Sequence, residues 1–435
     1  MEIVVQASAV DEKIPLEIAG PLVDPASYAS GAVLESYRWL RKNNPFGKAT
    51  LDGFDPFWVV TRHADILEVS RRNDLFPYGD KSSTLTDAAS TARMREITGG
   101  RPNLVRSLVQ MDEPDHNRYR ALTQAWFMPP SVRRREEHIR HVAEAAVNRL
   151  VDMAGRCDFV KEVALGYPLH IVMSILGIPE TDEPRMLRLT QELFGPQDPD
   201  TARATAALSA TRYAEILQAT IDDFTRYFGT IVADRRESPR DDLASVIANA
   251  RIGGDFLPDV ETSSYFIVIA TAGHDTTSSS IAAGMHALAS DPTLLARIQN
   301  DVSLIPGFVD ESIRWATPVK TFMRSASQSM EFAGRQIEKG DWVMLCYASG
   351  NRDEGVFEDP DVFRADRTPN RHLAFGYGAH LCLGQHLAKL EMRLFWEALI
   401  PRLKSVELDG EANYSASWFV NGLKTLPIRF ELKPV

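Results

Sequence analysis

The sequence predicts a mainly α-helical protein with small β-sheets, on three observations. Apolar residues recur at three- and four-residue steps along segments 135–153 and 211–234, which is the pattern of half-buried helices. Strand-like runs are few and short, at 56–61, 342–345 and 427–432. These runs do not alternate with helices in the regular order of a βαβ fold.

Composition and charge argue against several classes of protein. The 435 residues are 44% hydrophobic and 25% charged, as in an ordinary folded protein. The net charge of −11 argues against a nucleic-acid partner, because phosphate backbones bind to clustered positive charge. The start of the chain lacks the features of a signal peptide, and no run reaches the roughly 18 apolar residues of a membrane span. The three cysteines, Cys157, Cys346 and Cys382, give no disulfide framework. We therefore expect a cytoplasmic protein without a membrane segment.

The segment between Pro258 and Pro292 predicts a long central helix, which would span about 50 Å at 1.5 Å per residue. Its first half is apolar nearly all round, as a buried helix should be. Segment 272–280 then reads AGHDTTSSS, in which Gly and short polar side chains weaken the helix. A polar break in a buried helix indicates a functional site; the alternative is a polar turn that faces ordered water.

A second unusual segment, 375–384, reads FGYGAHLCLG and precedes a predicted helix over 385–399. A thiolate at a helix start faces backbone N–H groups, which lower its pKa and suit a metal ligand. A buried structural cysteine would not need the neighbouring glycines. Zinc would need His380 and His386 as partners of Cys382, in a spacing that matches no usual closed zinc site. An axial thiolate to haem iron needs only the cysteine, with glycines that let the ring approach the backbone.

Segment 375–384 resembles the haem-binding loop of the cytochrome P450 family, Phe-Gly-x-Gly-x-His-x-Cys-x-Gly. Segment 272–277 resembles the oxygen-activation motif of the family's central helix. Segment 112–120 is similar to the helix that contacts a haem propionate in bacterial members. The resemblance implies the P450 fold over 1–435: a single triangular domain with a long central helix and a small β-rich lobe.

A fourth motif, Glu311-Ser-Ile-Arg314, resembles the Glu-x-x-Arg motif of the family, with Arg367 as the third member of the charge cluster. The resemblance implies a buried element for folding and haem incorporation. From spacing alone, Glu311 and Arg314 would equally suit an exposed i,i+3 ion pair.

The resemblance also implies the cofactor and its contacts. The cofactor is haem b, held without covalent attachment, with Cys382 as the metal ligand and O₂ as the co-substrate. Asp275 is expected to relay protons and Thr276 to hydrogen-bond O₂ in the pocket, while His274 serves spacing and hydrogen bonding. The other residues expected to contact haem are Phe375, Gly376 and Gly384 around the cysteine, and His116, Arg120, Arg324 and His380 at the propionates.

The implied reaction inserts one oxygen atom into a C–H bond of a small apolar cyclic substrate. The resemblance is strongest to bacterial hydroxylases of monoterpenoids, such as alpha-terpineol, and of p-cymene-like alkylbenzenes. The expected substrate contacts are Val268, Ala272, Val319, Phe419 and Val420, each of which would equally suit a plain core position. Segments 82–103 and 186–213 are expected to form mobile lids. Alternatives are the same chemistry on a steroid or fatty acid, a peroxide-using variant, and a haem-thiolate sensor without turnover; the Asp-Thr pair argues against the last two.

The chain contains no flavin- or iron–sulfur-binding segment, so electrons must come from outside. We expect a [2Fe-2S] ferredoxin with an NAD(P)H-dependent reductase, and a monomeric enzyme. Six residues are expected to form a basic docking patch, or else a plain solvated face: Arg118, Arg133, Arg134, Arg135, Lys389 and Arg393.

Overall fold

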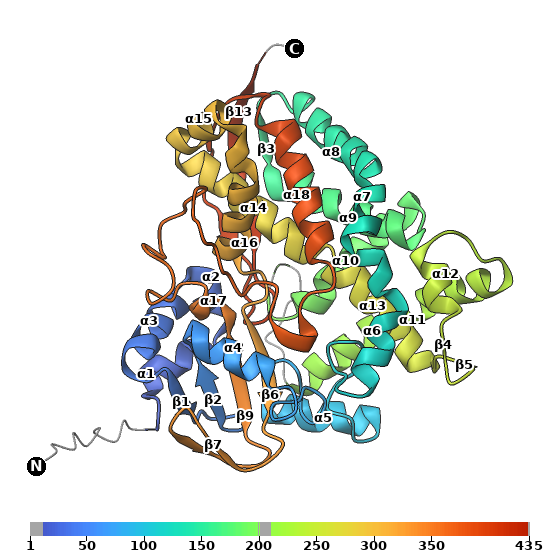
Figure 1. Ribbon diagram of the computed structural model, residues 1–435, viewed down its shortest axis with the longest axis vertical. Helices are drawn as coiled ribbons and strands as arrows, with labels where there is room; N and C mark the ends of the chain where they lie inside the picture. Colours follow the sequence, from blue (N-terminus) through green and yellow to red (C-terminus); the bar gives the residue numbers. More distant parts are fainter. Residues whose placement is uncertain (1–11, 199, 201–209, 434–435) are drawn as a thin grey trace, which may run out of the picture.

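The computed structural model describes residues 12–198, 200 and 210–433, which form a mostly helical molecule of broadly triangular outline (Figure 1). The predicted fold class, mainly α with small β-sheets, is confirmed. The helices are α1 (Leu16–Ala19), α2 (Pro25–Ser30), α3 (Val33–Asn43), α4 (His63–Arg71), α5 (Ala88–Thr98), α6 (Asp115–Phe127), α7 (Pro129–Arg134), α8 (Glu136–Val151), α9 (Gly166–Leu176), α10 (Glu183–Phe194), α11 (Ala210–Glu237), α12 (Leu243–Ala248), α13 (Asp259–Ala272), α14 (Asp275–Ser290), α15 (Pro292–Asn300), α16 (Ile305–Ala316), α17 (Tyr347–Gly350) and α18 (Gln385–Leu399). The strands are β1 (Phe46–Ala49), β2 (Phe57–Val60), β3 (Arg156–Asp158), β4 (Arg251–Ile252), β5 (Asp255–Phe256), β6 (Thr321–Ser325), β7 (Met330–Phe332), β8 (Arg335–Ile337), β9 (Trp342–Cys346), β10 (Leu403–Leu408), β11 (Asn413–Tyr414), β12 (Leu423–Thr425) and β13 (Pro427–Leu432).

The largest sheet has the strand order β1–β2–β9–β6 and lies at the lower left of Figure 1. The predicted strands at 56–61 and 342–345 are β2 and β9, and they pair in parallel. Neighbouring side chains of β2 point into different apolar clusters, Phe57 into one and Trp58 into the other. Because both faces are buried, the strand is an unbroken apolar run. The predicted strand at 427–432 is β13, between β10 and β3 in a second sheet.

The predicted helices at 135–153, 211–234 and 385–399 are confirmed as α8, α11 and α18. α18 packs along α8 and also contacts α16 and the central helix. Its apolar side includes Phe395 and Trp396, both fully buried. These contacts hold α18 in the core, and its first turn follows directly on the cysteine loop.

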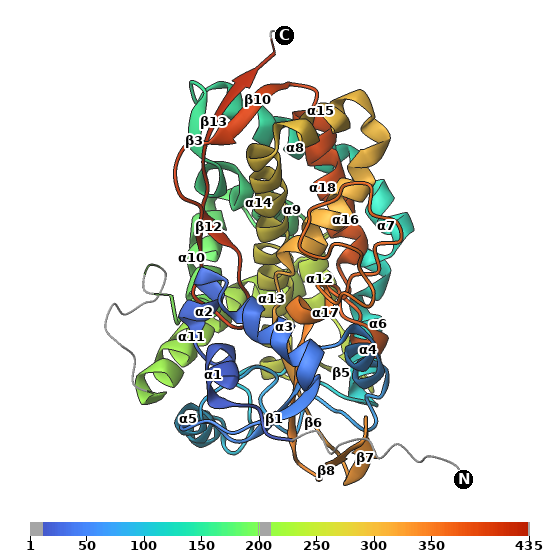
Figure 2. The ribbon, with the colours of Figure 1, turned by 90° about the vertical axis from the view of Figure 1, so that its left-hand side faces the viewer.

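The long central helix predicted between Pro258 and Pro292 is confirmed, and the weakening predicted for segment 272–280 is a break in it. The chain forms two helices, α13 and α14, which run through the middle of the molecule one above the other (Figure 2). They meet at Gly273, whose missing Cβ would lie 3.0 Å from the Val172 side chain on α9. The hydroxyl of Thr276 donates to the Ala272 carbonyl at 2.8 Å, so a side chain bonds a backbone acceptor at the break.

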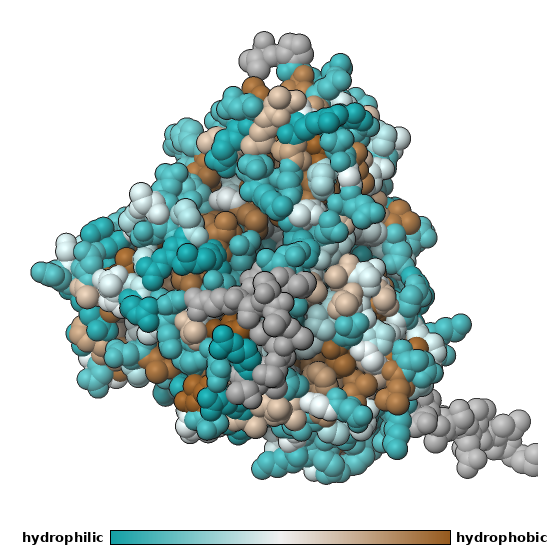
Figure 3. Space-filling view, turned by 180° about the vertical axis from the view of Figure 1, so that it is seen from behind, coloured by the Kyte–Doolittle hydropathy of each residue, from teal (hydrophilic) through white to brown (hydrophobic). Residues whose placement is uncertain are grey.

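The face seen from behind carries mostly hydrophilic side chains, with smaller apolar patches between them (Figure 3). Among the helices of the described ranges, none is long and apolar enough to cross a membrane.

Candidate active site

A cavity lies between the break in the central helix and the loop that precedes α18. α13 and α14 form one wall and the cysteine loop forms the other. The structure brings twelve of the predicted site residues to this cavity: His116, Arg120, Val268, Ala272, Thr276, Val319, Arg324, Phe375, Gly376, His380, Cys382 and Gly384.

The backbone of the cysteine loop is tightly determined. The N–H of Cys382 donates to the Phe375 carbonyl at 2.9 Å. Gly378 has a φ of +76°, and a Cβ there would lie 2.3 Å from the Ser70 carbonyl oxygen. Only glycine fits such a position, since it has no side chain and tolerates a positive φ. The turn therefore presents Cys382 to the cavity just before α18 begins.

Burial raises the pKa of the Cys382 thiol above its ordinary value, while the backbone N–H groups of Gly384 and Gln385 and the charge of Arg120 oppose that shift. We expected the helix start to lower the pKa; its N–H groups act in that direction, but desolvation outweighs them. A bound metal cation reverses this balance, because a thiol that coordinates a metal loses its proton. The environment suits a ligand thiolate better than a free reactive one.

The zinc alternative lacks ligands. Across the part of the chain that the structure describes, no three His, Cys, Asp or Glu side chains gather in a metal-binding group. His380 instead packs its ring 4.2 Å from that of His116 and 4.3 Å from that of Tyr78.

Several buried side chains at the cavity have nitrogens without a hydrogen-bond partner, and such groups could bind an anion. His116 and Arg324 are both 1% exposed, and four of their side-chain nitrogens have no hydrogen-bond partner. Burial lowers the pKa of His116 to about 4, that of His380 to about 2 and that of Arg324 to about 10. Unpaired buried donors cost about 1–3 kcal/mol each. The carboxylates of a haem fit these groups, and the apolar walls fit its ring. Arg120 already donates to the Leu381 carbonyl at 2.8 Å and steadies the cysteine loop.

Thr276 and Asp275 are adjacent in sequence but face different surroundings. Thr276 lines the cavity. Asp275 is not among the lining residues; its carboxylate Oδ1 lies 3.3 Å from Nδ1 of His274. Burial raises the pKa of Asp275, and the neighbouring His274 opposes that shift. The Thr276 hydroxyl therefore lies at the cavity, whereas the Asp275 carboxylate does not.

An apolar chamber adjoins the cavity and shares Val268, Ala272, Thr276 and Val319 with it. All five predicted substrate contacts line this chamber, including Phe419 and Val420. Val319 and Val420 form an isolated antiparallel bridge, so the two pocket segments are fixed against each other.

Both predicted lid segments contribute to the chamber, although 199 and 201–209 lie outside the described residues. From segment 82–103 come Ser82, Ser83, Thr84, Leu85, Met94 and Asn103, and from 186–213 come Leu193, Phe194, Pro196, Gln197 and Tyr213. Sequence reasoning missed Phe322 of β6, which lines both spaces and whose ring lies 5.2 Å from that of Phe419.

A buried carboxyl group was also missed. Glu391 of α18 lines the cavity, and burial raises the pKa of Glu391 well above its ordinary value, opposed by a hydrogen bond from Thr277. Its backbone carbonyl accepts the hydroxyl of Tyr167 at 2.8 Å. The signal was present in the sequence: Glu391 lies on the same apolar stripe of α18 as Leu387 and Leu394.

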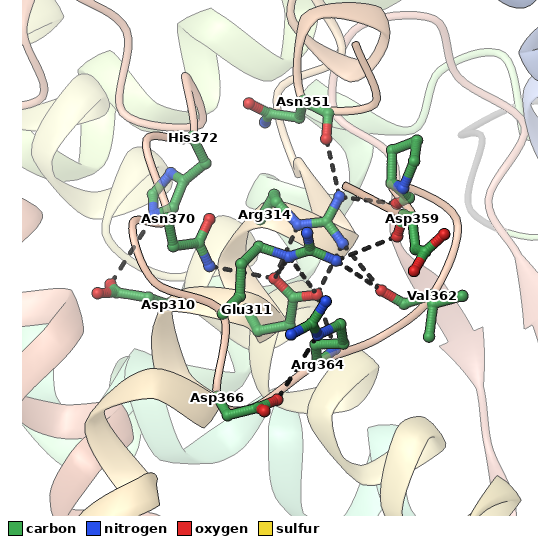
Figure 4. Close-up of polar contacts among 12 residues, drawn as sticks. Asp310, Glu311, Arg314, Asn351, Asp359, Val362, Arg364, Asp366, Asn370 and His372 are labelled. Carbon is green, nitrogen blue, oxygen red and sulfur yellow. Dashed lines mark hydrogen bonds and ion pairs between the residues drawn. The ribbon is translucent and has the colours of Figure 1, made fainter. Parts of the chain in front are cut away.

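The charge cluster is buried, and Figure 4 shows Glu311 and Arg314 directed toward each other among their polar contacts. Nε and Nη2 of Arg314 each lie 2.7 Å from a carboxylate oxygen of Glu311. Nε of Arg367 lies 3.1 Å from the same carboxylate, and the Asn370 amide also donates to it at 3.1 Å. Both guanidinium groups further donate to backbone carbonyls of segment 351–362. The three predicted residues thus lie together in the core, and the exposed ion pair was the wrong alternative.

The expected basic patch is partly neutralised. Three of its six members have carboxylate partners: Lys389 with Asp310 at 2.7 Å, Arg393 with Glu136 at 3.1 Å and Arg118 with Asp115 at 3.9 Å. Arg133 and Arg134 are exposed at the end of α7, and the guanidinium of Arg135 lies over the Trp126 ring. The patch is therefore weaker than its count of cations suggests.

Comparisons with known proteins agree with this site. Residues 84–413 match the family model described as Cytochrome P450. Cytochrome P450-terp from a Pseudomonas species is 48% identical over 419 residues, which cover 96% of this chain and 98% of that protein. A steroid C26-monooxygenase from Mycolicibacterium smegmatis is 30% identical over 94% of this chain and 95% of its own. The crystal structure of CYP108D1 from Novosphingobium aromaticivorans has a TM-score of 0.89 and 43% identity, covering 97% of this chain and 100% of that one. This chain therefore belongs to the cytochrome P450 family and is a monooxygenase that uses haem with a cysteine thiolate, O₂ and electrons from redox partners.

Proposed function

We propose that the protein hydroxylates a small apolar cyclic molecule, a monoterpenoid such as alpha-terpineol or a p-cymene-like alkylbenzene. The observation that carries this proposal is the apolar chamber that joins the cavity beside Thr276. The walls of the chamber include four short, uncharged aliphatic side chains: Val268, Ala272, Val319 and Val420. Such walls favour an apolar ring, because its removal from water is favourable. The 48% identity to Cytochrome P450-terp supports the same substrate class.

Haem, when bound, would supply the chemistry of O₂ activation, to which a cysteine thiolate ligand would contribute electron density. In our proposal Cys382 is the ligand, and Phe375, Gly376 and Gly384 shape the loop around it. His116, Arg120, Arg324 and His380 hold the propionates. The Thr276 hydroxyl both donates and accepts at the cavity wall, and the Asp275 carboxyl carries protons to that turn of the helix. Glu311, Arg314 and Arg367 fix the segments that carry the loop.

The same chemistry on a larger lipid is the second candidate. A relative named steroid C26-monooxygenase aligns over nearly the full chain. The chamber also continues past its aliphatic part to Thr84, Asn103 and Gln110, where a longer or more polar molecule would find hydrogen-bond partners.

For the redox partner we propose a [2Fe-2S] ferredoxin with an NAD(P)H-dependent reductase, acting on a monomer in the cytoplasm. Arg133 and Arg134 are the exposed cations that an acidic ferredoxin would meet first, since their side chains project from a short helix next to α18. The acidic net charge of the whole chain does not oppose this, because docking depends on the local patch.

Visible-spectrum titration of the purified ferric protein tests the substrate class. The panel is alpha-terpineol, p-cymene, a fatty acid and a steroid. A Soret shift from low to high spin with the two small cyclic compounds, at micromolar concentration, supports the proposal. A shift only with the fatty acid or the steroid refutes the small-substrate proposal in favour of the second candidate.

A further inference from the structure

Segment 104–110, which we call the strap, follows the predicted lid segment 82–103 and precedes α6 in the chain. It forms neither a helix nor a strand. Its six residues other than Arg106 all line the apolar chamber or the cavity beside Cys382: Leu104, Val105, Ser107, Leu108, Val109 and Gln110. The strap is therefore a wall of the substrate space, and its position depends on contacts with other segments.

Arg106, which is not among the lining residues, ties the strap to two helices. Its Nη1 lies 2.6 Å from Oε1 of Glu261 in α13, and its Nη2 lies 2.6 Å from Oδ2 of Asp115 in α6. Its backbone N–H donates to the hydroxyl of Ser264, one turn after Glu261, at 2.9 Å. Both carboxylates are in the first turns of their helices, where the helix dipole favours negative charge. One residue thus joins the strap to the starts of both helices.

An arginine in exposed ion pairs would be an ordinary surface residue, because such pairs are common and weak. Here the side chain of Glu261 is only 12% exposed, and those of Arg106 and Asp115 are 34% and 40% exposed. A carboxylate as enclosed as Glu261 needs a partner, because an isolated buried charge is unfavourable. Within the described part of the chain Arg106 is that partner, whereas Asp115 also has Arg118 at 3.9 Å. The pair with Glu261 is therefore the stronger tie.

The C-terminal end of the strap is tied to the first predicted lid segment. The Gln110 side-chain amide donates to the Ser83 hydroxyl at 3.1 Å. Gln110 also lines the polar part of the chamber together with Thr84 and Asn103, where a molecule longer than a monoterpenoid would extend. Movement of the strap to admit such a molecule would break the contacts of Arg106.

We propose that Arg106 is a specificity-determining residue of the hydroxylase that acts from outside the substrate space. Its pairs with Glu261 and Asp115 hold the strap against α13 and α6, so the chamber favours a short ring over a longer lipid. A longer molecule that displaces the strap must break these pairs, and its affinity falls by the free energy of that opening. The inference rests on the proposed function and names the residue that selects between its two candidate substrate classes.

The test compares the wild-type holoprotein with four variants: Arg106→Leu, Arg106→Lys, Glu261→Gln and Arg38→Leu. Leu keeps an apolar stem without charge, and Lys keeps the charge without the forked geometry that binds two carboxylates. Glu261→Gln weakens the same tie from the helix side. Arg38→Leu is the matched control, because Arg38 also bridges two carboxylates, Glu35 at 2.6 Å and Asp361 at 3.0 Å. None of these three control residues lines the chamber or the cavity.

The Soret shift of each ferric protein gives the Kd of alpha-terpineol and of testosterone. In Arg106→Leu the Kd of testosterone should fall about fivefold relative to that of alpha-terpineol. This change corresponds to about 1 kcal/mol, as for the loss of two partly exposed ion pairs. Glu261→Gln should give most of the same change and Arg106→Lys an intermediate one, while Arg38→Leu should keep the wild-type ratio. The changes of Arg106→Leu and Glu261→Gln should not add in the double variant, because both remove the same tie.

Three results would overturn the inference. The first is a wild-type ratio of the two Kd values in Arg106→Leu and Glu261→Gln. The second is an equal change in Arg38→Leu, which would reflect a general loss of surface charge. The third is testosterone that binds neither the wild type nor any variant. Arg106→Lys and Glu261→Gln keep the test open to refutation if Arg106→Leu incorporates no haem.

The wild-type titration separates this inference from the proposed function. If alpha-terpineol binds the wild type more tightly than testosterone and the variants leave the ratio unchanged, the proposed function stands and only the role of Arg106 falls. If the wild type binds testosterone more tightly, the proposed substrate class fails, and the role of Arg106 fails with it.

Discussion

Replacing Glu311 with Gln tests the buried charge cluster. The carboxylate balances two guanidinium groups that have almost no solvent contact, Arg314 at 0% and Arg367 at 7% exposed. Gln keeps the shape and one acceptor oxygen but leaves both charges without a counter-ion. Removing one partner from a buried ion pair costs about 3–5 kcal/mol. At about 2.1 cal/mol/K of unfolding entropy per residue, a chain of 435 residues should unfold about 3–5 °C lower.

The pH dependence gives the same prediction a second test. Burial disfavours the charged form of Glu311, but hydrogen bonds and charge from Arg314 and Arg367 outweigh it and hold the pKa of Glu311 below its usual value. A lowered folded-state pKa contributes stability above the unfolded pKa of about 4.3, and that stability is lost as the pH falls through the folded value. The wild type should therefore lose stability below about pH 4 more steeply than Glu311→Gln.

The assay is thermal unfolding of the ferric holoprotein, followed by circular dichroism and the Soret band from about pH 2.5 to about pH 8, so that the range includes the acid loss expected for the lowered pKa of Glu311. The matched control is Asp366→Asn, a half-exposed carboxylate that pairs with Arg297 at 3.5 Å and should change stability by under about 0.5 kcal/mol. A Glu311→Gln variant that unfolds within 1 °C of the wild type, or with the same acid slope, would show that the cluster is not a source of stability.

Three further predictions follow from the site. With Thr276→Ala, the reconstituted system should still oxidise NAD(P)H but should give about 100-fold less product and release peroxide. Product and peroxide assays in parallel measure this. An unchanged yield of product per NAD(P)H would contradict the role of the Thr276 hydroxyl. Arg324→Leu should stabilise the haem-free protein slightly, because unpaired buried nitrogens disappear, and should speed haem transfer to apomyoglobin about tenfold; unchanged transfer would remove Arg324 from the propionate contacts. The Arg133→Glu, Arg134→Glu double variant should be reduced about tenfold more slowly by ferredoxin at low salt, with the difference vanishing near 0.5 M; salt-independent rates in stopped-flow would exclude electrostatic docking there.

Local chemistry made parts of this site visible in the sequence. The glycines and the helix start around Cys382 indicated a tight turn that suits a metal ligand, and the resemblance of segment 375–384 to the haem-binding loop of the family identified the ligand. The apolar run of β2 was readable because it is buried on both faces, and the periodicity of α8, α11 and α18 because one face of each is buried.

The features of the site that could not be predicted from the sequence depend on contacts between segments that are distant in the chain. The break at 272–280 was predicted, but the close approach of Gly273 to the Val172 side chain on α9 could not be read from that segment. Which of the adjacent residues Asp275 and Thr276 faces the cavity depends on how α14 is rotated against its neighbours, so the sequence alone could not show it. Arg324 lies in none of the four motifs, yet it is only 1% exposed at the cavity, because the neighbours that bury it come from elsewhere in the chain.

The parallel pairing of β2 with β9 has a consequence for synthesis on the ribosome. β1 and β2 form a hairpin early, but the second edge of β2 has no strand beside it until residues 342–346 have been made. At about 5–20 residues per second, that edge waits for roughly 15–60 s. An apolar strand with an open edge is prone to aggregate during such a wait. Slower expression at low temperature with abundant chaperones should therefore raise the yield of folded protein more than added haem does.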